Sequence, residues 1–294
     1  MTQTEPPAPW RQRRASIHRR WKVPFVFCEW CCERLAFQIN QCALVRVLES
    51  LGKLSLLVAV VVYIWGIPER SRAVENAKKV KHYQAWQMIN SAAGLSGDGG
   101  RKLALQDLCA DEVNLDLINL SNAVFDGLQL HGCSMKRGNL DGTDFSSANI
   151  RLMNFYRASF RGSHSLGSRY LEACFVSVDA RNAVFNCCHF TASTFEGADL
   201  RGASFINCDA KNVSFRFADL RGASISEFPS GKWKMSDLDF RDANIAGIQA
   251  DPSIKERMTR MGAVSIEKNS EWDDFKRKQH FDPELQEMRF LLRP

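Results

Sequence analysis

A repeat of five residues constrains this chain more than any other feature. Between residues 115 and 225, 23 positions are spaced by five, and 20 of them carry a large apolar residue. The exceptions are Ser165, Ala180 and Ala210. A second set of residues, two places earlier in each unit, is mostly small, as at Ala198 and Ala218. Neither a helix nor a flat strand has a period of five, so the pattern predicts a fold of repeating coils.

In such a coil, one large and one small residue of each five point inward, and the other three face solvent or turn a corner. Residues that tolerate turns follow two places after the large residues, as at Gly202 and Asn182. Neighbouring coils then pair through backbone hydrogen bonds about 4.8 Å apart. Phe155, Phe175 and Phe195 recur at every fourth unit and predict an inward aromatic column, which continues to Phe215. The sequence therefore predicts an all-β solenoid.

The sequence ADLRG occurs at residues 198–202 and again at 218–222. This motif and its repetition resemble the pentapeptide-repeat family. The resemblance covers residues 115–250 and implies a right-handed quadrilateral β-helix with four repeats in each coil. It is specific for the fold and says almost nothing about function.

Composition and pattern divide the chain into six segments. They are a basic disordered tail (1–23), an amphipathic helix (24–50), a transmembrane helix (51–67), a helical linker and N-terminal cap (68–110), the pentapeptide-repeat β-helix (111–250), and a C-terminal helical cap and tail (251–294). A short helix is expected from Arg101. Two more are expected from Asp251-Pro252 and from Asp282-Pro283, because Asp caps a helix and Pro fits its first turn. Solenoid ends need such covers.

The most apolar stretch, residues 54–67, has no charged residue and 14 positions. Counted from Leu51 it has 17, at the low edge of the roughly 20 that span a bilayer. Tyr63 and Trp65 stand where an aromatic belt would lie. A buried core helix is the alternative, but a β-helix fills its own interior. The stretch therefore predicts an α-helical, single-pass membrane anchor with the lipid bilayer as a partner, and a helix end at Pro68.

Charge does not decide the orientation of that anchor. The net charge is +5 over residues 1–53, +4 over 68–102, −3 over 103–250 and zero over 251–294. Because both flanks of the apolar segment are basic, the side of the membrane that holds the repeats stays open. The sequence HYQAWQMIN at residues 82–90 is similar to the region before the repeats in bacterial membrane-anchored pentapeptide proteins. That resemblance implies a single apolar helix just upstream.

The chain has ten cysteines, and their spacing argues against a disulfide framework. Cys133, Cys188 and Cys208 occupy the small inward slot, where a reduced thiol acts as a small hydrophobe. Cys188 and Cys208 should stack on adjacent coils, so a bridge between them is left open. The sequence CEWCC at residues 28–32 favours packing, or lipidation near a membrane, over a redox or metal pair. His189 should point outward beside inward Cys188, so no metal site and no cofactor are expected.

Motifs of the common enzyme classes do not occur in the sequence. We find no Gly-rich phosphate loop, no His-Glu-x-x-His and no Gly-x-Ser-x-Gly. Ser163, His164 and Ser165 form the weakest repeat and predict a kinked coil rather than a nucleophile and its base. The sequence therefore predicts a protein that is not an enzyme.

Two outward columns of charge follow from the coil of four repeats. The candidate interaction face consists of Arg161, Arg181, Arg201, Arg221, Asp179, Asp199 and Asp219. Residues two apart on a strand share a face, so these columns should run side by side. They either neutralise each other or form a docking face for a protein partner of mixed charge. Arg161 follows Ser159 instead of Asp, which predicts an unpaired end there, and Asp239 and Arg241 extend the columns if the register persists.

These features favour a non-enzymatic, membrane-anchored scaffold whose β-helix binds an unidentified protein. The alternative is a soluble regulator that binds or mimics nucleic acid, with residues 54–67 serving as an oligomerisation or capping helix. Whether the chain forms a homo-oligomer stays open. Some pentapeptide proteins resemble double-stranded DNA and so act on topoisomerases. That role needs a strongly acidic rod, whereas the net charge of residues 103–250 is only −3. Nucleic acid is therefore the less favoured partner.

Overall fold

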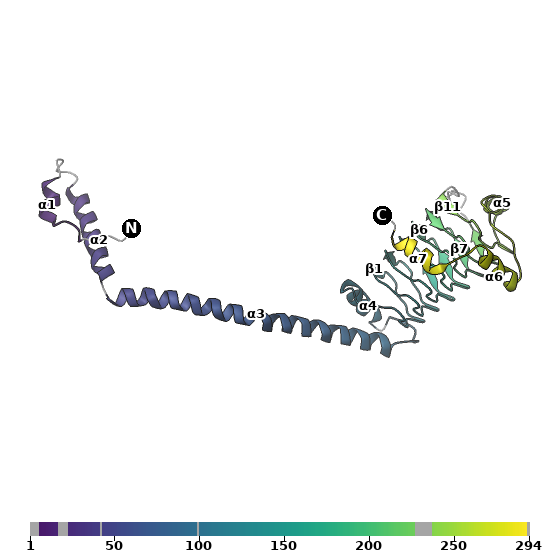
Figure 1. Ribbon diagram of the computed structural model, residues 1–294, viewed down its shortest axis with the longest axis horizontal. Coiled ribbons are helices and arrows are strands. Elements are labelled where there is room, and N and C mark those ends of the chain that lie inside the picture. Colours follow the sequence, from purple (N-terminus) through teal and green to yellow (C-terminus); the bar gives the residue numbers. More distant parts are fainter. Residues whose placement is uncertain (1–5, 17–22, 42, 99, 227–236, 293–294) are drawn as a thin grey trace. The chain divides into compact units, whose positions relative to one another are not determined.

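The computed structural model describes residues 6–16, 23–41, 43–98, 100–226 and 237–292. The chain divides into two compact units, Met1–Lys78 and Lys79–Pro294. Figure 1 shows the elements of both units along the chain. The first unit is helical, and the second holds all the described strands.

The first unit begins with a small helical pair, α1 (Trp10–Ala15) and α2 (Val23–Gln41). The Trp10 ring lies 4.8 Å from the Phe27 ring, edge to face. The guanidinium of Arg13 pairs with the Glu33 carboxylate at 2.5 Å. Part of the tail predicted to be disordered is therefore helical, because its aromatic and basic residues find partners on α2. The rest of that tail, 1–5 and 17–22, lies outside the described residues.

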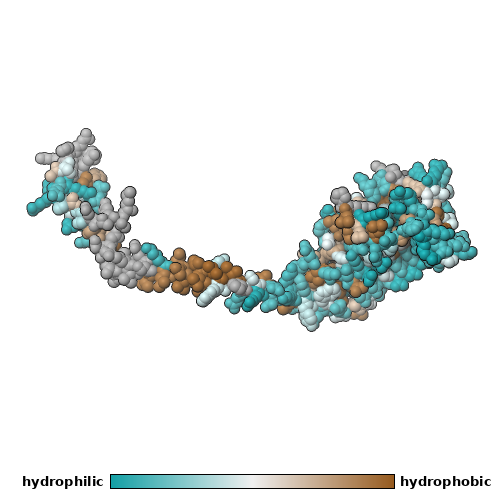
Figure 2. All heavy atoms as spheres, viewed as in Figure 1, coloured by the Kyte–Doolittle hydropathy of each residue, from teal (hydrophilic) through white to brown (hydrophobic). Residues whose placement is uncertain are grey.

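Helix α3 (Ala43–Ser91) runs through two places where the sequence predicted a boundary. It begins inside the predicted amphipathic helix, and it continues through residue 68, so the predicted helix end there is wrong. A proline removes one backbone hydrogen bond, and the turns on both sides still form theirs. The section Lys53–Ser91 includes an 18-residue window of mean hydropathy 1.4, none of it buried. The brown band in Figure 2 shows this apolar surface.

The second unit is a β-solenoid of about five turns, with a helix before it and short helices after it. Its strands are β1 (Gln129–His131), β2 (Asn149–Arg151), β3 (His164–Leu166), β4 (Arg169–Leu171), β5 (Val184–Asn186), β6 (His189–Thr191), β7 (Ser204–Ile206), β8 (Asp209–Lys211), β9 (Val213–Ser214), β10 (Ser224–Ser226) and β11 (Leu238–Asp239). They form three parallel sheets, ordered β1-β2-β4-β6-β8, β10-β7-β5-β3 and β11-β9. The predicted fold class is confirmed.

The coil has the predicted length of four repeats, since Ile150 pairs with Leu130 on one side and with Tyr170 on the other. The predicted aromatic column is also present, with ring centroids separated by 5.2, 4.6 and 5.2 Å along Phe155, Phe175, Phe195 and Phe215. These rings are at most 1% exposed. Each buried Phe contributes roughly 1.5–3 kcal/mol, so the column is a main source of stability.

The repeat predicted to be kinked is regular, and that prediction is wrong. Strand β3 pairs with β5 in register, with Ser165 opposite Phe185. Ser165 takes the slot of a large residue because its hydroxyl lies 2.6 Å from the Tyr170 hydroxyl, and the two buried groups satisfy each other.

The register changes after Ile225, where one coil gains a fifth unit. Asp219 now faces Asn244, and Asp239 pairs with Ser214, so the partners in both pairs are five units apart instead of four. Asp239 and Arg241 therefore leave the charged columns and join the neighbouring side of the solenoid, contrary to the extension considered above. Residues 227–236, which hold the added unit, lie outside the described residues.

Helices precede and follow the solenoid, as predicted. They are α4 (Arg101–Ala110) before it, and α5 (Pro252–Arg260), α6 (Asn269–Lys278) and α7 (Pro283–Leu291) after it. The Asp251 and Asp282 side chains accept hydrogen bonds from the first backbone N–H groups of α5 and α7. Arg101, fully buried, donates to the carbonyls of Ala92 and Leu95 at 2.7 and 2.8 Å and so fixes the turn from α3 into α4.

The cysteines depart from the prediction at one place. Cys109 of α4 and Cys133 of the first coil form a disulfide with a Cα–Cα distance of 5.6 Å, so Cys133 is not a reduced thiol. The spacing of the repeat placed Cys133 inward but could not show that α4 brings Cys109 beside it. Cys188 and Cys208 are free and buried. The hydrogen bond with Cys188 is the main cause that raises the pKa of Cys208, and burial is the second.

Candidate interaction faces

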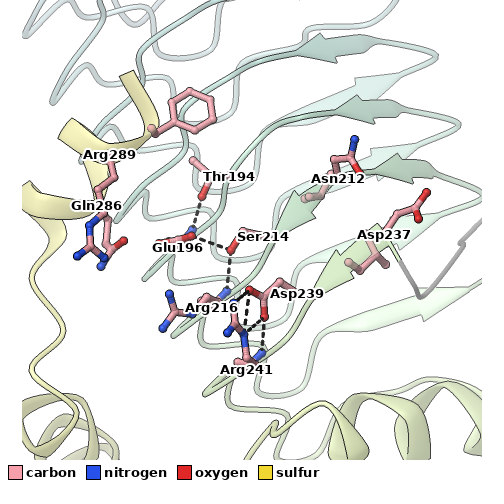
Figure 3. A pocket seen from close by; sticks show the side chains of 13 residues that line it. Thr194, Glu196, Asn212, Ser214, Arg216, Asp237, Asp239, Arg241, Gln286 and Arg289 are labelled. Atoms are coloured by element: carbon pink, nitrogen blue, oxygen red, sulfur yellow. Dashed lines mark hydrogen bonds and ion pairs between the residues drawn. The ribbon is translucent and has the colours of Figure 1, made fainter. Parts of the chain in front are cut away.

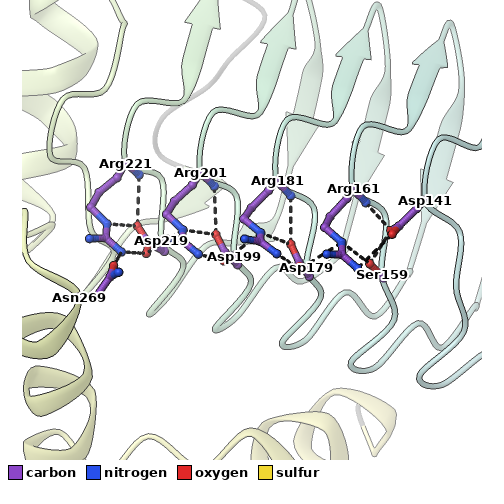
Figure 4. Close-up of polar contacts among 10 residues, drawn as sticks. All are labelled: Asp141, Ser159, Arg161, Asp179, Arg181, Asp199, Arg201, Asp219, Arg221 and Asn269. Carbon is purple, nitrogen blue, oxygen red and sulfur yellow. Dashed lines mark hydrogen bonds and ion pairs between the residues drawn. The ribbon is translucent and has the colours of Figure 1, made fainter.

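One side of the solenoid carries the predicted charged columns, which we call the ladder face (Figure 4). It consists of Asp141, Ser159, Arg161, Asp179, Arg181, Asp199, Arg201, Asp219 and Arg221. Each Arg lies two residues after an Asp or Ser on the same strand edge, so their side chains emerge together. The structure thus brings all seven predicted residues to one face.

Every Asp of the predicted set is held by the Arg of its own rung. The Asp179 carboxylate accepts from Arg181 Nε and Nη2 at 2.8 and 2.7 Å. Asp199 accepts from Arg201 at 2.8 and 2.5 Å in the same way. Longer contacts cross between rungs, such as 3.6 Å from Arg181 Nε to Asp199 Oδ2. The columns form a continuous network in which opposite charges alternate.

Both ends of the ladder face are paired, which corrects the expected unpaired end. Arg161 Nη2 lies 3.1 Å from Asp141 Oδ2, because Asp141 occupies the Arg column one coil earlier. At the other end, Arg221 donates to the Glu267 carbonyl and to Asn269 Oδ1, both at 2.6 Å. The segment entering α6 therefore closes the ladder.

This pairing changes the proton affinity of Asp179 and of Arg201. Burial by itself would raise the pKa of Asp179, but hydrogen bonds from Arg181 and the charges of Arg181 and Arg161 outweigh it and lower that pKa. The hydrogen bond that Arg201 donates to Asp199 is the largest of the effects that raise the pKa of Arg201. Both groups are charged at neutral pH, so the ladder face presents alternating charge rather than a field of one sign.

An adjacent side of the solenoid is covered by α7, and we call it the covered face. Its outward residues are Asn154, Tyr156, Cys174, Val176, Thr194, Glu196, Ser214 and Arg216, with Lys136 at its start. Glu287 of α7 is only 7% exposed. Its carboxylate accepts hydrogen bonds from Lys136 Nζ and Asn154 Nδ2, both at 2.7 Å. Phe290 of α7 packs on Tyr156, Cys174 and Val176.

The repeat pattern alone does not reveal the covered face. The sequence does contain a sign of this face: Tyr156, Cys174 and Val176 are apolar at outward positions, where a coil exposed to solvent would carry polar residues. The covering segment could not be located from the repeat, since Glu287 lies 133 residues from Asn154. Before α7, Phe281 packs on Phe217 at 4.8 Å and sits against Gly197, where a Cβ would collide with its ring.

Two cavities flank α7 on the covered face. The Tyr156 cavity, about 420 Å³, is lined by Asp116, Leu117, Lys136, Arg137, Tyr156, Glu284, Glu287 and Met288. The Arg216 cavity, about 410 Å³, includes Thr194, Glu196, Arg216, Arg241, Gln286 and Arg289 (Figure 3). Among the residues that the structure describes, no group of three His, Cys, Asp or Glu side chains is arranged to hold a metal ion.

Comparison with known proteins identifies the repeats. The pentapeptide-repeat family matches residues 125–162, 173–209 and 188–226, in eight copies. No curated protein sequence matches the chain. The repeats of this chain are therefore pentapeptide repeats, as the motif predicted.

Several solved structures are similar over about half of the chain. A trypsin-treated variant of QnrB1, a plasmid-mediated fluoroquinolone resistance protein, has 16% identity and a TM-score of 0.30, covering 49% of this chain and 92% of that one. Rfr23 from the cyanobacterium Cyanothece 51142 has 17% identity and a TM-score of 0.22, covering 49% and 91%. HetL from Nostoc sp. strain PCC 7120 has 18% and 0.17, covering 52% and 85%. Likenesses of this size support no statement about function.

Proposed function

We propose that this chain is a non-enzymatic, membrane-anchored scaffold of bacterial type whose pentapeptide-repeat solenoid binds a protein partner. The observation that carries the proposal is the exposed apolar section of α3. Residues 54–67 show large apolar side chains all round the helix, from Val61 at 37% to Trp65 at 79% exposure. A helix that is apolar on every side needs either a protein core or a bilayer around it.

The flanks of this section fit a bilayer. Residues 51–67 rise about 26 Å at 1.5 Å per residue, close to the roughly 30 Å of a hydrocarbon core. Lys53 and Arg70 can reach the interface at either end. The Arg70 guanidinium lies 5.2 Å from the Tyr63 ring centroid, an arrangement suited to a headgroup layer. Both flanks are basic, so the proposal does not specify the side of the membrane.

The solenoid supports a scaffold rather than a catalyst. Its interior is filled by the Phe column, and its ladder face offers a rigid surface of alternating charge. Such a surface selects a partner by charge pattern more than by total charge. We propose the seven predicted ladder residues as a docking face, which Arg161→Glu and Arg201→Glu should weaken without unfolding the coils. Unchanged capture of membrane proteins by both variants would contradict that role.

Membrane fractionation of the full chain tests the anchor. The wild-type chain should sediment with membranes through carbonate washing and require detergent for release. The double variant Val60→Arg and Val61→Arg should move to the soluble fraction, because each Arg costs about 2.5–3.5 kcal/mol at a bilayer centre. Val74→Arg with Val80→Arg is the matched control, since both side chains are exposed on the polar part of α3. A wild-type chain that is soluble without detergent would refute the anchor.

A further inference from the structure

Two buried polar atoms on the covered face have no hydrogen-bond partner. Within the part of the chain that the structure describes, the unpartnered buried side-chain atoms are the Tyr156 hydroxyl and Arg216 Nε. Tyr156 lines the Tyr156 cavity, and Arg216 lines the Arg216 cavity. Buried polar groups are normally paired, and an unmade bond costs about 1–3 kcal/mol. Helix α7 lies between the two cavities and satisfies neither atom.

Helix α7 contributes no carboxylate to the lining of the Arg216 cavity. Arg289 projects from α7 into the cavity that holds Arg216 and Arg241 (Figure 3). Arg241 is paired with Asp239 at 2.6 Å. Arg216 instead places its guanidinium 5.4 Å from the Phe217 ring centroid. A carboxylate brought toward Arg216 from α7's position would complement this guanidinium.

The solenoid side of the covered face defines what fits it. Its basic residues are Lys136, Arg137, Arg157, Arg216 and Arg241, and its acidic residues are Asp116, Glu196, Asp237 and Asp239. Asp239 is held by Arg241. Glu196 is already occupied, because it accepts from the Ser214 hydroxyl at 2.8 Å. Between these charges lies the apolar strip of Tyr156, Cys174 and Val176. An acidic residue followed three places later by an aromatic residue matches this surface, as Glu287 and Phe290 already show.

We propose that the covered face is a docking site for an acidic amphipathic helix of a protein partner, and that α7 occupies it as an intramolecular placeholder. The proposal rests on the scaffold function above and specifies the chemistry of its partner. A partner helix would keep the Glu and aromatic contacts of α7, add a carboxylate toward Arg216 and bring an acceptor to the Tyr156 hydroxyl. A nine-residue helix such as α7 is marginal by itself, so its release costs little secondary structure.

Thiol accessibility reports whether α7 can leave. Cys174 is fully buried beneath Phe290, and burial raises its pKa to about 12, so it should resist alkylation at pH 8. In the full chain carrying Phe281→Ala and Phe290→Ala, Cys174 should become alkylated while core Cys208 stays protected. Glu287→Lys should do the same by repelling Lys136. Protection of Cys174 in both variants would mark α7 as a permanent part of the fold and overturn the proposal.

Peptide binding in detergent tests the partner chemistry. The probe is a labelled peptide of residues 279–292, made with the natural sequence, with Arg289→Glu and with Glu287→Lys. The Phe281→Ala, Phe290→Ala chain should bind the Arg289→Glu peptide at least tenfold more tightly than the natural peptide. It should not bind the Glu287→Lys peptide. Adding Arg216→Ala to the chain should remove the tenfold preference and leave binding of the natural peptide unchanged.

Two results would refute the proposal. The first is that the wild-type chain and the Phe281→Ala, Phe290→Ala chain bind the Arg289→Glu peptide with equal affinity, which would place the peptide's binding site elsewhere. The second is that the Phe281→Ala, Phe290→Ala chain has an alkylated Cys174 but does not bind this peptide, which would show that the open face does not accept such a helix. Because binding is measured in detergent, failure of the membrane anchor would leave this test unaffected.

Discussion

The ladder face and the covered face lie on the same coils but are completed in different ways. On the ladder face, each charge meets its opposite on the same rung or on the next coil, as Asp179 does with Arg181 and Arg161. On the covered face, Asn154 and Lys136 depend on Glu287 from the end of the chain. The ladder face pairs its charges within the repeat and takes added bonds from a distant segment only at Arg221, whereas the covered face has its polar groups paired only when α7 docks. This contrast suggests that the covered face is the one that can open and close.

Removing the shared aromatic column should damage both faces and give the largest effect. Phe195 stacks between Phe175 and Phe215 and is fully buried. Phe195→Ala should lower the free energy of unfolding by about 3–5 kcal/mol, because it removes the ring and leaves a cavity. Urea unfolding followed by far-UV circular dichroism measures the change. Exposed Leu117→Ala is the control, and equal midpoints for the two variants would contradict the stacking argument.

Loss of the Glu287 carboxylate should affect the covered face alone. Its side chain is 10% exposed and pairs with Lys136, whose pKa is raised chiefly by that hydrogen bond. Glu287→Ala should reduce the local stability of α7 by about 2 kcal/mol, because Lys136 and Asn154 lose their partner. Hydrogen exchange of residues 283–291 should accelerate about thirtyfold. Glu284→Ala is the control, since that side chain is 71% exposed, and comparable acceleration in it would contradict a specific role of Glu287.

Two glycines with the same backbone conformation separate docking from backbone strain. Gly197 and Gly222 have φ values of +67° and +64°, where a side chain is strained. A Cβ on Gly197 would overlap Phe281, whereas a Cβ on Gly222 meets nothing within 4 Å. Both Ala variants should lose about 1 kcal/mol from strain, and Gly197→Ala about 1 kcal/mol more from displaced packing. Equal melting temperatures would show that Phe281 does not hold the segment before α7.

The smallest effect is expected from the ladder face, and it depends on pH. Asp179 has a lowered pKa in the fold, so its contribution to stability is present above the unfolded pKa of about 3.9 and is lost as pH falls through the folded value. Asp179→Asn should cost about 0.5 kcal/mol at pH 7, because the pair is partly exposed. Thermal unfolding of both proteins from pH 7 to pH 2.5 should converge at the acid end. A constant difference across this range would exclude the ion pair as the cause.

The repeat allowed much of the solenoid and of the ladder face to be predicted. A period of five with four repeats in each coil places Phe155 over Phe175 and Asp199 beside Arg201 without any knowledge of other segments. The end of the ladder was predicted wrongly at two points. Asp141 stands in the Arg column, one coil before Arg161, and pairs with it. The extra unit after Ile225 carries Arg241 to the covered face.

What the sequence determined by itself is local in the coil. Apolar spacing, small residues and opposite charges each act within one coil or between adjacent coils, so their pattern is sufficient to specify the stack and its register. Contacts between segments far apart in the chain were decided only by the tertiary structure. The Cys109–Cys133 disulfide, the burial of Cys174 and the pairing of Glu287 with Lys136 all depend on how α4 and α7 dock. No periodicity encodes that docking, because it arises from the shape and charge of surfaces that exist only once the coils have formed.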